Sequence, residues 1–180
     1  MKKPNLLAFI WGLAESTLFF FLPDVIITRI ALEGYRKGFV SCFYALAGAL
    51  IGGSIMFIWG SNNLPGARTI LDHIPAISIG MMDKVQKNIS HEGVVAILKG
   101  PFLGIPYKIY AIHSFNSGVG YLAFIMISIP ARLTRFFILT SFFSWLSTSP
   151  LKNWSMKNKT ILVYMFWIAI YTLYFSKMPN

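Results

Sequence analysis

Two acidic residues, Glu15 and Asp24, lie within a mainly apolar stretch that covers residues 6–28. An ionised carboxylate at the centre of a bilayer costs about 2.5–3.5 kcal/mol unless it finds water or an opposite charge. Burial favours the neutral form of a carboxyl group, and this suits a group that takes up and releases protons. We therefore identify both residues as candidate proton-binding groups. Two structural interpretations stay open: a salt bridge at Glu15 that only fixes packing, and a helix start at Asp24, which follows Pro23.

Four basic residues interrupt later apolar stretches of the chain: Lys99, Lys108, Arg132 and Arg135. A single lysine at the edge of such a stretch can extend its charge to the membrane surface. The two arginines lie three positions apart and share one face of a helix. Because arginine and lysine donate hydrogen bonds to phosphate oxygens, the four residues together predict a site for an anionic substrate such as a lipid phosphate. The residues predicted to shape the backbone around this site are Pro23, Pro101, Gly104 and Pro106.

The composition excludes most classes of soluble protein. Apolar residues make up 56% of the 180 residues and charged residues 12%, against about 25% charged in a soluble domain. A chain of this size cannot bury so much apolar surface in water. The net charge of +10 comes from basic residues between apolar stretches, as in loops that face anionic lipid. This indicates membrane lipids as partners, with no nucleic acid, and leaves a homo-oligomer open.

No motif of a known catalytic or metal site occurs in the sequence. The single cysteine, Cys42, builds neither a disulfide within the chain nor a thiolate metal site. No HExxH, GxSxG or Walker-type motif is present. An enzyme acting on lipid phosphates would need a clustered set of acidic residues and histidines, which the sequence lacks. We therefore predict a protein without cofactor, metal or enzymatic activity.

The hydropathy pattern predicts an all-α integral membrane protein with a single membrane domain over 1–180. The predicted transmembrane helices are 38–60, 119–148 and 160–176. The stretches 6–28 and 94–117 contain charges and prolines, and are predicted to form re-entrant hairpins whose freed backbone groups need partners inside protein. The polar section 61–92 contains an amphipathic helix, either at the membrane surface or packed on its own protein. Pro130 predicts a kink in the fourth apolar stretch, or its division into two elements.

The distribution of Lys and Arg favours two re-entrant stretches over five spanning helices. With the N-terminus in the cytoplasm and 6–28 and 94–117 returning to their own sides, eight of these residues lie in 25 cytoplasmic positions. With five spanning helices, eight lie in 48 cytoplasmic positions. The totals are equal, but the density follows the positive-inside rule better in the first topology. We therefore expect the N-terminus to lie in the cytoplasm.

A helix with small residues follows the first hairpin. Gly48-Ala49-Leu50-Ile51-Gly52 permits another helix to come close, although the pattern does not specify which helix. Together with Glu15 and the Pro23-Asp24 pair, this helix resembles the DedA/VTT superfamily (the SNARE-associated-like group), whose motif reads GAxxGDxxxYxxGR. Four positions match that motif: Gly48, Ala49, Gly52 and Gly60. Gly53, Phe57 and Ser61 stand in place of its Asp, Tyr and Arg.

The resemblance extends over about residues 12–140, and the chain is identified as a divergent member. This implies a location in the inner membrane of a bacterium. The segment from Lys99 to Lys108 is similar to the basic, proline-containing second hairpin of the family. The resemblance implies two re-entrant hairpins that meet in a cavity, and movement of an anionic lipid such as a polyprenyl phosphate or phospholipid, with proton coupling. The substituted Asp and Arg positions leave the particular lipid and the proton coupling open. The alternative is a non-transporting membrane scaffold or envelope assembly protein.

Overall fold

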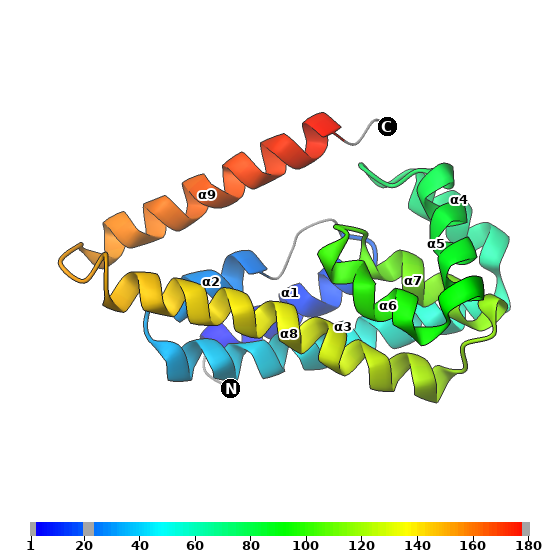
Figure 1. Cartoon of the computed structure of the whole chain (residues 1–180), viewed down its shortest axis with the longest axis horizontal. Helices are drawn as coiled ribbons and strands as arrows, with labels where there is room; N and C mark the ends of the chain where they lie inside the picture. Colours follow the sequence, from blue (N-terminus) through cyan, green and yellow to red (C-terminus); the bar gives the residue numbers. More distant parts are fainter. Residues whose placement is uncertain (1–2, 20–23, 178–180) are drawn as a thin grey trace.

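In the computed structural model the chain is built from helices, and residues 3–19 and 24–177, which the structure describes, contain no strand. In chain order the elements are α1 (Lys3–Ser16), α2 (Asp24–Ala31), α3 (Tyr35–Asn62), α4 (Leu64–Asp72), α5 (Ile79–Glu92), α6 (Val94–Lys99), the 3-10 helix η1 (Gly100–Phe102), α7 (Tyr107–Ser114), the 3-10 helix η2 (Phe115–Ser117), α8 (Tyr121–Thr148) and α9 (Met156–Lys177). The predicted all-α class is confirmed (Figure 1).

Three helices are long and apolar enough to cross a membrane: α3, α8 and α9. A helix of 28 residues, the length of α3 and of α8, extends over about 42 Å, more than the roughly 30 Å of a hydrocarbon core. The three helices are compatible with an integral membrane protein. The helices α3 and α9 extend a few residues beyond their predicted bounds, and α8 begins two residues after its predicted start and ends where predicted. The helix α8 continues through Pro130, so this stretch is one helix and not two elements.

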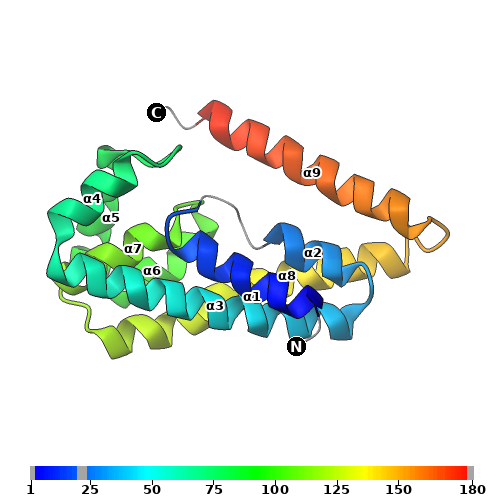
Figure 2. The same cartoon turned by 180° about the vertical axis from the view of Figure 1, so that it is seen from behind.

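The other two apolar stretches each form short helices separated by a break. The first stretch contains α1 and α2, and the second contains α6 and α7. In Figures 1 and 2, α1 and α2 enter from one end of the molecule and return to it, whereas α6 and α7 enter from the opposite end. The breaks meet near the middle, where Lys108 Nζ at the start of α7 donates to the carbonyl of Phe19 over 2.6 Å.

Small residues allow α1 to pack against α3, the most extensive helix pair in the molecule. A Cβ atom at Gly48 of α3 would lie 2.1 Å from the carbonyl oxygen of Phe9, and one at Gly12 of α1 would lie 2.2 Å from that of Ala45. No Cβ atom approaches an oxygen so closely, so both positions need glycine at this separation of the helices. The close helix contact predicted from the small residues is thus confirmed, and α1 is the helix that packs against α3.

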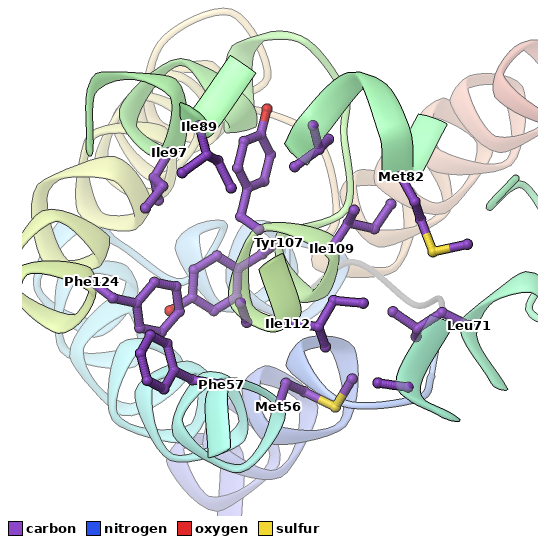
Figure 3. Close-up of a cluster of buried hydrophobic side chains, with 14 of the residues drawn as sticks. Met56, Phe57, Leu71, Met82, Ile89, Ile97, Tyr107, Ile109, Ile112 and Phe124 are labelled. Atoms are coloured by element: carbon purple, nitrogen blue, oxygen red, sulfur yellow. The ribbon is translucent and has the colours of Figure 1, made fainter. Parts of the chain in front are cut away.

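The apolar face of the amphipathic helix α5 is buried against other helices of the protein. Met82, Val85 and Ile89 are fully buried in the largest core cluster, together with Ile97 of α6 and Ile112 of α7 (Figure 3). Of the two interpretations of the pattern in 61–92, packing on its own protein is therefore correct. This face therefore contacts α6 and α7 and not lipid, and the location of α5 at the membrane surface stays a prediction.

The last helix, α9, diverges from the rest of the molecule along its length (Figures 1 and 2). Near its start, Lys159 Nζ donates to the carbonyl oxygen of Ser147 at the end of α8 over 2.7 Å. At its middle, Trp167 Nε1 donates to Thr28 Oγ1 of α2 over 2.9 Å. Of the residues in its most apolar 18-residue segment, only 17% are buried within the protein. The helix is thus fixed at separate points and leaves most of its apolar surface exposed.

Candidate functional site

A cavity of about 250 Å³ lies where the two broken segments meet α8 and α9. Four charged residues line it: Glu15, Lys108, Arg132 and Arg135. The remaining wall is mainly apolar and aromatic, and includes Phe102, Trp167 and Tyr171. Large apolar pockets with a few convergent polar groups are the usual form of a ligand site, so this cavity is the candidate functional site.

Glu15 and Arg132 form a buried ion pair across the cavity wall. Arg132 Nη2 donates to Glu15 Oε2 over 2.6 Å and to Ser16 Oγ over 3.2 Å. The guanidinium carbon of Arg132 lies 4.2 Å from the ring centroid of Tyr107, a cation–π contact. Among the described residues, Arg132 Nε is buried without a hydrogen-bond partner. A buried donor of this kind needs water or a ligand to complete its hydrogen bonding.

Asp24 and Arg135 form a second ion pair just behind the cavity wall. Asp24 is completely buried in the first turn of α2, where the helix dipole stabilises a carboxylate. Its Oδ1 atom has no hydrogen-bond partner among residues 3–19 and 24–177. Arg135, with about a quarter of its side chain exposed, is the more accessible partner and itself lines the cavity. Asp24 therefore acts on the cavity through Arg135.

Lys108 is a buried cation without a carboxylate partner in the described part of the chain. Its ammonium group donates to the carbonyl of Phe19, which follows the end of α1. An ammonium group has three N–H donors, and this bond uses one of them. Lys108, Arg132 and Arg135 together outnumber the carboxylates of Glu15 and Asp24 by one charge. The cavity therefore favours an anion.

The structure brings together most, but not all, of the residues predicted from the sequence. Pro101, Gly104 and Pro106 line the cavity beside the charged groups. Lys99 does not join them: its side chain is more than half exposed and pairs with Glu92 at the surface, 2.9 Å away. Pro23 lies outside the described residues.

The sequence did not predict that several aromatic residues belong to the site. Tyr107 supports Arg132 with its ring and donates its hydroxyl to Ser128 Oγ over 2.8 Å. Trp167 and Tyr174 of α9 also line the cavity, and the hydroxyl of Tyr174 donates to the carbonyl of Gly104 over 3.2 Å. Aromatic residues near the ends of a span usually indicate interfacial anchors. The only sequence signal that could have found Tyr107 is its place beside Lys108 in the broken stretch.

No group of three or more metal-ligating side chains occurs in the part of the chain that the structure describes. Comparison with known proteins adds no relative: no family model, no curated protein and no solved structure matches the chain.

Proposed function

We propose that this protein binds an anionic lipid and moves it across a membrane, as a divergent member of the DedA/VTT group. The observation that supports this is the convergence of three basic side chains and one carboxylate in a cavity with apolar walls. Broken helices beside a polar cavity are typical of membrane transport sites. Phosphate oxygens of a lipid headgroup accept the hydrogen bonds that arginine and lysine donate. The cargo class is a polyprenyl phosphate or a phospholipid.

The proposed topology has α3, α8 and α9 crossing the membrane and two hairpins that enter it from opposite sides. The helix α1 has 14 residues and extends over about 21 Å, too short for a hydrocarbon core. The helices α6 and α7 are shorter still. The N-terminus then lies in the cytoplasm, on the same side as the turn between α2 and α3, where Lys37 and Arg29 pair with Glu33. The hydrogen bond from Lys37 lowers the pKa of the Glu33 carboxyl, so this turn stays charged.

Cysteine accessibility tests this topology. In a Cys42→Ser background, single cysteines at Lys3, Lys37 and Lys157 are expected to react with an impermeant maleimide from the cytoplasmic side. A cysteine at Ser90 is expected to react from the other side. Labelling of the Lys3 and Lys37 positions from opposite sides would contradict the first re-entrant hairpin, because α1 and α2 would then cross the membrane together.

The ion pairs suggest how a proton and an anion share the site. Protonation of Glu15 would remove the charge that holds Arg132 and free the guanidinium for a phosphate group. Loss of that proton would restore the pair and release the anion. Proton uptake and lipid binding are thereby coupled through one carboxylate. This is the proposed role of Glu15, and Asp24 acts on Arg135 in the same way.

Lys108 and Lys99 provide a matched pair of variants for the transport test. The protein is reconstituted in vesicles that contain an acyl-labelled fluorescent phosphatidic acid, and an impermeant reductant bleaches the outer leaflet. Lys108→Gln is expected to slow lipid translocation about tenfold or more, because a charge-assisted hydrogen bond to the headgroup is lost. Lys99→Gln removes the same charge from a surface ion pair, which contributes little. Equal rates in both variants and the wild type would contradict the proposal.

One observation favours the alternative of a membrane scaffold: Glu15 Oε2 already accepts hydrogen bonds within the protein, from Arg132 Nη2 over 2.6 Å and from Ser16 Oγ over 3.3 Å. A scaffold predicts that Glu15→Gln lowers the amount of folded protein and has no separate effect on lipid movement. A loss of translocation per amount of folded protein would exclude this alternative. The measurement is quantitative immunoblotting of the membrane fraction beside the vesicle assay.

A further inference from the structure

A second cavity, of about 360 Å³, adjoins the candidate site between α8 and α9. It shares Arg135 and four other lining residues with the first cavity: Pro101, Phe102, Trp167 and Ile170. The residues that line only the second cavity are all apolar: Ile138, Leu139 and Phe166. Arg135 is the only charged residue among its described lining. The two cavities thus form one continuous space with charges at one end and apolar side chains at the other.

The arrangement of α9 keeps this space open toward the outer surface of the molecule. Ile138 of α8 and Phe166 of α9 are both exposed on that surface as well as lining the cavity. The two ends of α9 are held by Lys159 at Ser147 and by Tyr174 at Gly104. Exposed apolar residues continue along both helices, which are long enough to cross a membrane. The opening therefore faces hydrocarbon in the proposed topology.

We infer that the space between α8 and α9 is a lateral entrance for lipid, in which the headgroup phosphate binds at Arg135 and Lys108 and one hydrocarbon chain lies against Ile138, Leu139 and Phe166. This inference rests on the proposed function and names its entry route. The occupant is an anionic lipid because the excess positive charge lies at the inner end of the space and the apolar wall begins directly beside it. A water-soluble anion would leave that wall without a partner.

Trp167 provides a reporter, since it lines both cavities and only 5% of its surface is exposed. A single-tryptophan protein is made by replacing the other four tryptophans with phenylalanine: Trp11, Trp59, Trp145 and Trp154. It is reconstituted in vesicles of phosphatidylcholine and phosphatidic acid in fixed proportion. Bromine atoms, which quench tryptophan fluorescence on contact, are placed in the acyl chains of one lipid or of the other. The vesicles then differ only in which lipid can quench.

Brominated phosphatidic acid is expected to quench Trp167 more strongly than brominated phosphatidylcholine does at the same mole fraction. The expected difference is about fivefold for each basic side chain that binds the headgroup. The matched control retains Trp145 instead, which lies half-exposed on α8 outside both cavities. For Trp145, the two brominated lipids are expected to quench equally. Lys108→Gln in the Trp167 protein is expected to reduce the preference for phosphatidic acid. This variant breaks no ion pair among the described residues, and the glutamine side chain keeps N–H groups that can donate to the carbonyl of Phe19.

Equal quenching of Trp167 by both lipids, or no quenching by either, would overturn the inference. Quenching is measured at equilibrium and does not depend on translocation. If translocation occurs without preferential quenching of Trp167, the lateral entrance is wrong and the proposed function stands. If quenching is preferential but no lipid crosses the membrane, the entrance stands as a binding site and the translocase function is wrong.

Discussion

Arg132→Met is expected to lower the free energy of unfolding by about 3–5 kcal/mol, because it leaves the buried carboxylate of Glu15 without its partner. Glu15→Gln is expected to destabilise the protein in the same way, by leaving the buried guanidinium unpaired. The double variant Glu15→Gln/Arg132→Met is expected to regain most of the loss, since neither charge remains to be desolvated. Thermal unfolding in detergent, followed by circular dichroism, measures all three variants against the wild type.

The double variant also separates packing from function. It is expected to fold but not to translocate lipid, because the cation that binds the headgroup is absent. If it translocates lipid at the wild-type rate, the pair serves packing only and Arg132 does not bind the headgroup. If Arg132→Met alone costs less than about 1 kcal/mol, the pair behaves as an exposed one, contrary to its burial in the structure.

Gly48→Ala and Gly80→Ala are expected to have opposite effects on stability, although the chemical change is identical. The new methyl group at position 48 would lie 2.1 Å from the carbonyl oxygen of Phe9, and neither backbone can yield without separating α1 from α3. We expect a loss of about 1–3 kcal/mol. At position 80 in α5, a Cβ atom meets nothing within 4 Å, and alanine is expected to add about 0.5–1 kcal/mol. The measurement is chemical unfolding in mixed micelles.

The same pair of variants connects packing with the site. Because α1 carries Glu15 into the cavity, its displacement in Gly48→Ala is expected to reduce lipid translocation as well as stability. Gly80→Ala lies on the far face of α5 and is expected to leave translocation unchanged. If Gly48→Ala costs no more stability than Gly80→Ala, the contact between α1 and α3 is looser than the structure has it.

The sequence was sufficient for the fold class, because apolar stretches and proline breaks are local features. The sequence also predicted that Glu15 has a basic partner or water, because a carboxylate in an apolar stretch needs one. It did not identify that partner among four basic residues, because Arg132 lies 117 positions away and is brought near Glu15 only by the packing of both α1 and α8 against α3. Lys99 and Lys108 had the same type and a similar context in the sequence. They differ in the structure because Lys99 ends α6 beside Glu92, whereas Lys108 begins α7 facing the break of the first segment.

The placement of α9 is a second result that sequence reasoning did not reach. Its aromatic residues had the pattern of interfacial anchors, yet Trp167 bonds to α2 and faces the cavity. Hydropathy describes how a helix partitions between water and lipid. It does not determine which side of a spanning helix contacts protein, because lipid and protein interior are similarly apolar. For the same reason the apolar face of α5 could be assigned to membrane or protein only from the structure.

The opposed entry of the two hairpins gives the molecule an approximate internal symmetry. Each half consists of a hairpin followed by a helix of 28 residues, first α1–α2–α3 and then α6–α7–α8, with opposite orientations (Figure 1). The charges do not follow this symmetry: the first half carries both buried carboxylates, and the second half carries the three cations of the site. In the proposed topology, each leaflet receives one of the two hairpins. In the proposed function, therefore, the direction of net lipid movement is set by the lipid and proton gradients and not by the architecture.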